Sequence, residues 1–297
     1  MNLTGVQNAD TVPTPPQMDS PQRSNGSSTR PVLTAQPRAA GRSRVAGRVD
    51  RVLNSAIAGE RASVLNVTAK EMLADPFAVA GVFWAALERP GVGVMGHWMV
   101  HELLRRSNLH DDLVNALASP DPMTRAGAAR ICGAARLTEA VLWIDDLIAD
   151  PNPHVRDSAV RAMAQIGGSR AVDALMARSD TIPLYRLAIA LSLAVTDFDI
   201  EGLVRKPKDE RTALATVLAC GLRRDVLRVP ALLGIAHDRR WPKQVRVAAT
   251  KSLAMIADRS AADGLKRLAE SEPDPAVKLA AERAHRRLVR RAVGKPR

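Results

Sequence analysis

A proline-centred corner recurs through the chain and limits the folds that are open to it. In residues 141–176 two amphipathic segments flank the corner Asp-Pro-Asn-Pro, and a Gly-Gly pair ends the second segment. Asparagine caps a free helical amide, and proline is favoured at the first helical position, so this corner starts a helix. Apolar residues recur at helical spacing in both segments. The stretch is therefore predicted to form a helix pair with one apolar side.

Less regular copies of this unit follow one another at intervals of about thirty residues. Their corners are marked by Pro122, Pro153, Pro183, Pro207, Pro242 and Pro275. Three or four positions later each has a basic residue: Arg125, Arg156, Arg186, Arg211, Arg246 and Lys278. Seven positions further on, five of the six units have an apolar residue: Cys132, Met163, Leu193, Leu218 and Leu253. One unit cannot bury its apolar side alone, so neighbouring units must stack. We predict an all-α fold, a right-handed α-solenoid (superhelix) of stacked antiparallel helix pairs.

The corner resembles that of the HEAT repeat family in its short, thirty-residue form, which is named after phycobilisome lyase-like proteins. That family has Asp-Pro-x-x-Val-Arg followed by a small residue. Residues 150–156 with Ala159 are similar to this motif, and so are residues 274–278 with Ala280. The resemblance covers about residues 110–290. It implies the fold, whereas the function is left open because one scaffold hosts many roles.

Composition divides the chain into a leader and a repeat array. Residues 1–43 are rich in Pro, Ser and Arg and poor in large apolar residues, so we expect a disordered leader. Residues 44–297 form the predicted solenoid: divergent N-terminal helices at 44–108, clearer repeats at 109–204, and basic repeats with a cap at 205–297. Residues 196–199 interrupt the helical pattern, and a loop is predicted there.

The charge of the chain is unevenly distributed. The net charge is +12, and residues 205–297 carry 23 basic and 10 acidic groups. Such a region can attract an anionic partner. The candidate partner-binding residues are those of the basic corner and the last helix: Arg239, Arg240, Trp241, Lys243, Arg246, Arg286, Arg287, Arg290 and Arg291. The repeated basic residues Arg125, Arg156, Arg186, Arg211 and Lys278 are expected to be structural, because their long stems can pack beside the acidic corners.

No set of residues with the spacing of a catalytic or metal site emerges. His97 and His101 lie four apart, but Trp98 occupies the position that a zinc protease gives to glutamate. The di-iron site of HEAT-like deoxyhypusine hydroxylases resembles a set of His-Glu pairs drawn from several repeats. This chain has one such pair, His101 and Glu102. We therefore predict no catalytic residues, no metal and no cofactor.

Cellular location is inferred from the cysteines and from hydropathy. Cys132 and Cys220 lie in apolar helical patterns, as expected of core residues in a reducing compartment. No apolar run is long enough to span a bilayer, and no signal peptide is evident. We expect a cytoplasmic chain without membrane insertion, either a monomer or part of a hetero-complex.

These observations favour a non-enzymatic scaffold that binds a protein partner along its concave surface. The main alternative is a nucleic-acid-binding solenoid that uses the basic C-terminal third. Against it, only 3% of the residues are aromatic, so few side chains can stack on bases. A HEAT-like enzyme, of the lyase or the metal-dependent hydroxylase type, is the third possibility.

Overall fold

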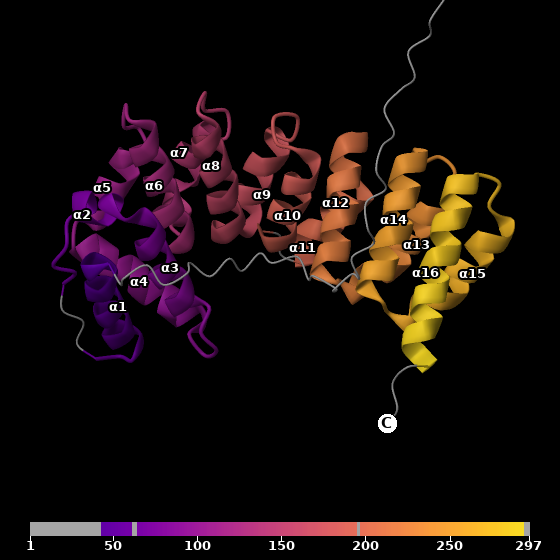
Figure 1. Ribbon diagram of the computed structural model, residues 1–297, viewed down its shortest axis with the longest axis horizontal. Helices are drawn as coiled ribbons and strands as arrows, with labels where there is room; N and C mark the ends of the chain where they lie inside the picture. Colours follow the sequence, from indigo (N-terminus) through magenta and orange to yellow (C-terminus); the bar gives the residue numbers. More distant parts are fainter. Residues whose placement is uncertain (1–42, 61–63, 195–196, 294–297) are drawn as a thin grey trace, which may run out of the picture. The chain divides into compact units, whose positions relative to one another are not determined.

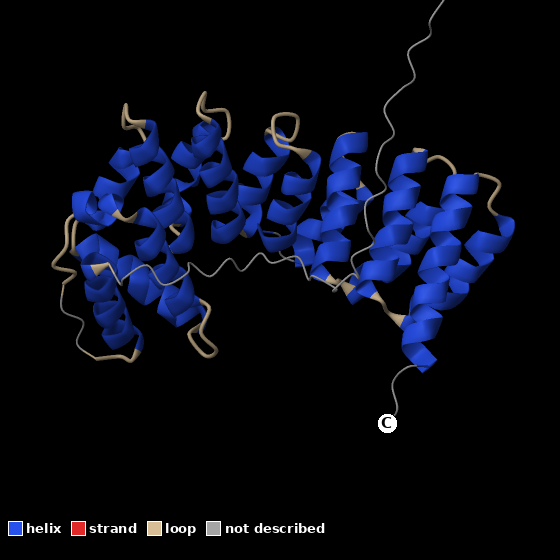
Figure 2. Ribbon diagram, in the orientation of Figure 1, coloured by secondary structure: helices blue, strands red, loops and turns tan. Residues whose placement is uncertain are grey.

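The computed structural model describes residues 43–60, 64–194 and 197–293. The side chains of residues 197–199, 201 and 291–293 are outside this description. Sixteen α-helices and three short 3-10 helices account for the regular structure of the described residues, and Figure 2 shows helices joined by loops. The predicted leader, except for its last residue, lies outside the described residues. That residue, Ser43, accepts a hydrogen bond from the amide of Ala46 and caps the first helix.

Six helix pairs make up the repeat array that the sequence predicts (Figure 1). The first helices of the pairs are α5 (Leu109–Ala116), α7 (Val141–Leu147), α9 (Gly168–Ala177), α11 (Asp197–Arg205), α13 (Val229–His237) and α15 (Ala262–Ser271). The second helices are α6 (Pro122–Ala134), α8 (Pro153–Ile166), α10 (Leu184–Ala194), α12 (Glu210–Arg223), α14 (Lys243–Ile256) and α16 (Pro275–Val293). Every second helix begins at a corner proline or within three residues of one, so the corner sets the start of each.

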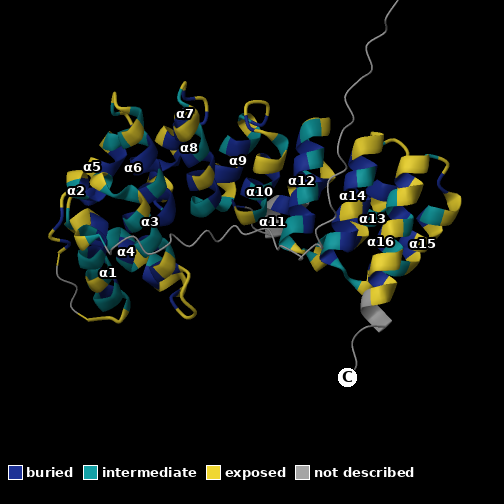
Figure 3. Cartoon of the chain, in the orientation of Figure 1, coloured by how far each residue is buried: buried dark blue, intermediate teal, exposed yellow. Residues whose placement is uncertain are grey.

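The second helices pack against one another in chain order, from α6 to α16. We call these six helices the second-helix layer. The first helices pack against one side of this layer, as in the contacts of α13 with α14 and of α15 with α16. We call the side that they cover the inward side, and the opposite side the outward side. The buried side chains belong to one continuous apolar core, and Figure 3 shows the helices with one buried side and one more exposed side. The outward side of the second-helix layer is therefore left uncovered by the described residues.

Four helices precede the six pairs. They are α1 (Arg44–Ile57), α2 (Ala69–Ala74), α3 (Pro76–Leu87) and α4 (Gly93–Arg106). Helix α3 packs against α6 and adds one more helix beside the second-helix layer. The 3-10 helices η1 (Thr138–Ala140), η2 (Val226–Arg228) and η3 (Arg259–Ala261) lead into α7, α13 and α15. No described helix is both long and apolar enough to cross a membrane.

Two details differ from the expectations. The predicted loop at 196–199 is wrong where it is described, because α11 begins at Asp197, and its Ile200 and Val204 are buried. The acidic residues of this segment obscure its helical apolar spacing in the sequence, but burial of Ile200 and Val204 favours the helix. The second difference is Leu193, which is 53% exposed, whereas Cys132 and Met163 at the same repeat position are fully buried. The buried side of α10 is formed instead by Leu187, Ala190, Leu191 and Ala194, so the position seven residues after Arg186 does not mark it.

Candidate partner-binding surface

Four of the repeated arginines bind backbone carbonyls near the corners. Arg125 donates to the carbonyls of Ser119 and Pro120, at 2.8 and 3.0 Å, just before its own helix. Arg156 does the same with the carbonyls of Asp150 and Pro151. Arg211 reaches the carbonyls of Ser179 and Ile182 in the preceding repeat, and Arg246 donates to Ala236. Their guanidinium groups are engaged inside the repeat array rather than offered to a ligand.

The other two repeated basic residues are more open. Arg186 is exposed and pairs with Asp157 on the neighbouring helix α8. Lys278 is exposed and makes no ion pair with the described residues. Of the five residues predicted to be structural, Arg125, Arg156 and Arg211 bind backbone carbonyls, Arg186 forms an ion pair, and Lys278 forms none with the described residues.

The basic corner before α14 is largely neutralised by acidic neighbours. Arg240 binds Asp238 through its Nε and Nη2 atoms, and Nη2 lies 2.9 Å from Oδ2. Lys243 lies 4.0 Å from Asp274. Trp241 is partly buried against the apolar core. The candidate corner therefore offers less free positive charge than its sequence indicates.

Arg246 must be removed from the candidate binding residues. Its side chain is 6% exposed and forms an ion pair with Glu272, which is itself 3% exposed. A buried guanidinium that already has a carboxylate partner cannot also meet a partner protein. The sequence pattern could not show this, because the neutralising carboxylate lies 26 residues further along the chain.

The remaining candidates stay accessible. Arg239 is exposed at the corner, and Arg286, Arg287 and Arg290 are exposed on α16. Of these, Arg286 lies 3.8 Å from Glu282 on the same helix. The Arg291 side chain lies outside the described residues. The exposed side of α16 is therefore the part of the predicted site that keeps free positive charge.

Charge is sorted between the two sets of helices. Within their bounds the six second helices carry sixteen basic and three acidic residues, and the six first helices carry four and ten. The net charges are thus +13 and −6. Four of the sixteen basic residues, Arg125, Arg156, Arg211 and Arg246, are bound to backbone carbonyls inside the array, so the charge open to a partner is smaller than this count.

A second basic ladder accounts for part of this charge, and the sequence analysis did not include it. Arg130, Arg161, Lys251 and Arg283 each lie five residues after a basic residue of the first ladder. Arg161, Lys251 and Arg283 are exposed and Arg130 is half-buried. None of the four forms an ion pair with the described residues. Their spacing is visible in the sequence, so counting five positions from the first ladder finds them.

The middle two second helices have no cation of this ladder, because the residues at the equivalent positions, Leu191 and Thr216, are uncharged and buried. Ile189 and Leu193 on α10, Leu214 and Leu218 on α12, and Val247 on α14 are half-buried or exposed. We call these five residues the apolar belt. Each of the two pairs is spaced by four residues, so it lies on one side of its helix. The belt lies between the free cations of α6 and α8 and those of α14 and α16.

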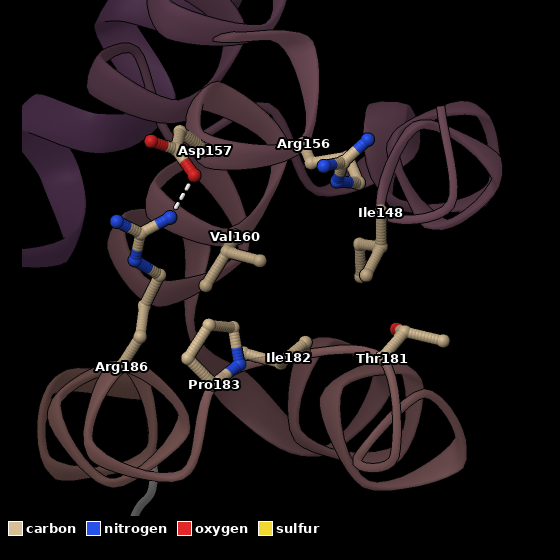
Figure 4. Close-up of a pocket in the computed structure, with 8 residues that line it drawn as sticks. All are labelled: Ile148, Arg156, Asp157, Val160, Thr181, Ile182, Pro183 and Arg186. Atoms are coloured by element: carbon tan, nitrogen blue, oxygen red, sulfur yellow. Dashed lines mark ion pairs between the residues drawn. The ribbon is translucent and has the colours of Figure 1, made fainter. Parts of the chain in front are cut away.

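A small cavity lies between the corners of the second and third helix pairs. It has a volume of about 120 Å³ and is lined by Ile148, Arg156, Asp157, Val160, Thr181, Ile182, Pro183 and Arg186. Figure 4 shows the Asp157–Arg186 ion pair on one side of the cavity and Arg156 with Ile148 on the other. Pockets for organic ligands usually measure roughly 300–1,000 Å³. The cavity is too small for such a ligand.

The histidines of the failed zinc motif bind neighbouring protein groups. His101 lies 3.2 Å from the carbonyl of Arg136 and 3.6 Å from the carboxylate of Glu139. His97 lies 3.1 Å from the guanidinium of Arg136. Burial lowers the pKa of His97, and the charge of Arg136 lowers it further. Among the described residues no group of three or more His, Cys, Asp or Glu side chains has a metal-binding arrangement.

The stacked helix pairs define the chain as an all-α solenoid. Residues 111–194, which span the first three helix pairs from α5 to α10, match the family model of HEAT repeats. The match includes the corner at residues 150–156, whereas the similar corner at residues 274–278 lies outside it. The subdivision into the short, phycobilisome lyase-like form is not part of this match.

Two solved structures are similar to the chain. Human deoxyhypusine hydroxylase in complex with glycerol matches with 16% identity and a TM-score of 0.34, over 83% of this chain and 97% of that chain. An engineered protein matches with 18% identity and a TM-score of 0.27, over 82% of this chain and 96% of that chain. Likenesses at these TM-scores carry no argument about function. No curated protein matches the sequence.

Proposed function

We propose that this protein is a non-enzymatic HEAT-repeat scaffold that binds a partner protein on the outward side of its second-helix layer. The observation that carries the proposal is the set of exposed cations on the second helices that form no ion pair with the described residues: Arg161, Lys251, Lys278, Arg283, Arg287 and Arg290. Exposed charges of this kind contribute little to stability, so folding does not require them. One-signed charge on a single side does, however, steer an oppositely charged partner.

The apolar belt supports a protein partner rather than a nucleic acid. A nucleic acid presents phosphates at regular intervals, and affinity comes from cations that follow them. On α10 the basic residue Arg186 is paired with Asp157, and on α12 Arg211 is bound to two carbonyls. The other basic residue of α12, Arg223, lies near Asp225. A phosphate backbone would therefore cross two helices with no free cation, whereas apolar protein side chains fit there.

Nucleic-acid binding by the C-terminal end is the second candidate. Arg283, Arg287 and Arg290 are exposed along α16, and none forms an ion pair with the described residues. Binding of this kind depends on counterion release, so its affinity falls steeply as salt is added. Protein interfaces depend mainly on a few buried anchors and are less sensitive to salt.

Capture from native cell extract tests the proposal. The full chain is immobilised as wild type, as the triple variant Arg161→Glu/Lys251→Glu/Arg283→Glu, and as the control Arg170→Glu/Lys266→Glu/Arg267→Glu. Both variants change the net charge equally, and all six residues are exposed. We expect a discrete protein that survives nuclease and moderate salt, that the control retains and that the second-helix variant loses. Capture that depends on nucleic acid, or equal loss by both variants, would contradict the proposal.

A further inference from the structure

The proposed function leaves open what kind of protein segment the surface accepts. We infer that the second-helix layer binds an acidic amphipathic segment, in which apolar side chains are flanked by carboxylates. This inference rests on the proposed function and adds the chemistry of the partner. Its basis is the order of side chains along the layer: free cations, then the apolar belt, then free cations again.

The first group of cations is formed by Arg130 and Arg161. The Arg130 guanidinium lies over the ring of Phe77, with its Cζ atom 4.1 Å from the ring centroid. Stacking of this kind fixes a guanidinium while leaving its edge N–H groups free to bind a carboxylate. Burial lowers the pKa of Arg130, and the charge of Arg161 lowers it further. A partner carboxylate bound by Arg130 would reduce this repulsion.

The apolar belt occupies the centre. Leu193 is 53% exposed, and Leu214, Leu218 and Val247 are partly buried against the core. Leucine and valine side chains at such positions favour binding of a partner that removes their apolar surface from water. Because the belt spans α10, α12 and α14, three adjacent helices, it accepts a segment with several apolar side chains rather than a single one.

The second group of cations is formed by Lys251, Arg283 and Arg287. All three are exposed, and none forms an ion pair with the described residues. The nearest acidic residue on the same helices, Glu282, is paired with Arg286. Positive charge on both sides of an apolar centre is complementary to a segment with carboxylates on both sides of an apolar centre. A basic or uncharged amphipathic segment would leave these cations unpaired or repelled.

A peptide display library tests the inference. Random sixteen-residue peptides are selected against the full chain at moderate salt, and the binding of enriched peptides is then measured by fluorescence anisotropy. We expect enriched peptides with two or more Leu, Ile or Phe residues flanked by Asp or Glu. We expect at least tenfold weaker binding to Leu193→Glu and to Arg161→Glu. The matched control is Leu142→Glu on α7, because Leu142 is 72% exposed on a first helix.

Three results would overturn the inference: no enrichment, enrichment of basic or uncharged peptides, or equal loss of binding in the Leu142→Glu control. Circular dichroism confirms that each variant keeps its helices, and Leu193→Ser serves if Leu193→Glu does not fold. The inference can fail by itself. A captured partner that depends on the second-helix layer but lacks an acidic amphipathic segment would sustain the proposed function and reject this partner chemistry.

Discussion

Arg125 and Asp150 are joined by two hydrogen bonds across the boundary between consecutive repeats. Nε of Arg125 lies 2.8 Å from Oδ2 of Asp150, and Nη2 lies 3.1 Å from Oδ1. The carboxylate also accepts a bond from the amide of Asn152 at its own corner. Arg246 and Glu272 repeat this arrangement, with Glu272 accepting from the amide of Asp274. The first basic ladder therefore links a helix to the next corner at both ends of the array.

Breaking this link should destabilise the array. Asp150→Ala leaves Arg125 buried without its carboxylate, and breaking a buried pair costs roughly 3–5 kcal/mol. Urea unfolding followed by circular dichroism measures the free energy of unfolding. The matched control is Asp157→Ala, which removes an ion pair with Arg186 whose side chains are 45% and 46% exposed, and such a pair contributes about 0–1 kcal/mol. Equal losses in the two variants would contradict a structural role for the first ladder.

Acid should weaken the same links. Burial raises the pKa of Asp150 and of Glu272, but hydrogen bonds from Arg125 or Arg246 and from a backbone amide, together with the nearby arginine charges, outweigh it, so both pKa values fall below their ordinary range. A carboxyl whose pKa is lower in the folded chain stabilises it above the unfolded pKa of about 4. That stability is lost as the pH falls through the lower, folded value.

The test compares urea midpoints of wild type and Asp150→Asn/Glu272→Gln between pH 7 and pH 3. We expect the variant to be less stable at pH 7 and to lose less stability below about pH 4, because it lacks both carboxyls. Parallel pH profiles would show that these two groups do not cause the acid sensitivity.

The fold could be predicted from the sequence because its causes are local and repeated. Each corner proline lies next to a helix start, and apolar spacing identifies the buried side of α7 and α8, where Val141, Ile144, Val155 and Met163 are buried. The helix at Asp197 was missed because its acidic residues hide the apolar spacing of Ile200 and Val204. The helix forms at that position because its apolar side chains are buried against neighbouring helices, and the sequence of one segment does not reveal such contacts.

The candidate surface could be predicted only in part. A count of basic residues finds the corner at Arg239 and Arg240 and the last helix, but it cannot tell which cations are neutralised. Glu272 and Asp274 neutralise Arg246 and Lys243 through contacts between repeats, whereas Asp238 neutralises Arg240 within the same corner. The exposure of Leu193 is missed because a count of seven residues from Arg186 does not follow the buried side of α10, which Leu187, Leu191 and Ala194 form.

A glycine sets the close approach of α6 and α8. A Cβ atom at Gly133 would lie 2.5 Å from Cα of Ala162 and 2.8 Å from its Cβ, and the backbone cannot move aside as a flexible side chain would. Gly133→Ala should therefore destabilise the chain by about 1–3 kcal/mol. Gly234 in α13 is the control, because a Cβ there meets nothing within 4 Å. Gly234→Ala should stabilise the chain by about 0.5–1 kcal/mol. Urea midpoints that shift the same way in both variants would contradict the close packing at Gly133.

The two cysteines report on how far unfolding spreads along the array. Burial raises the pKa of the Cys132 thiol and of the Cys220 thiol to about 12, so almost no thiolate is present at pH 8. A thiol reagent such as dithionitrobenzoate reacts with thiolate, so labelling of native protein should wait for local opening. We expect negligible labelling of the native chain within minutes and two labels in urea.

Local opening should expose Cys132 and Cys220 to the thiol reagent at different rates. Cys132 lies in α6 next to Gly133, whereas Cys220 lies in α12. In a repeat array each unit contacts mainly its neighbours, so destabilisation at one interface spreads only partly. Gly133→Ala should therefore raise the labelling rate of Cys132 more than that of Cys220, as read by mass spectrometry of labelled peptides. An equal increase at both cysteines would show instead that the chain opens as a single cooperative unit.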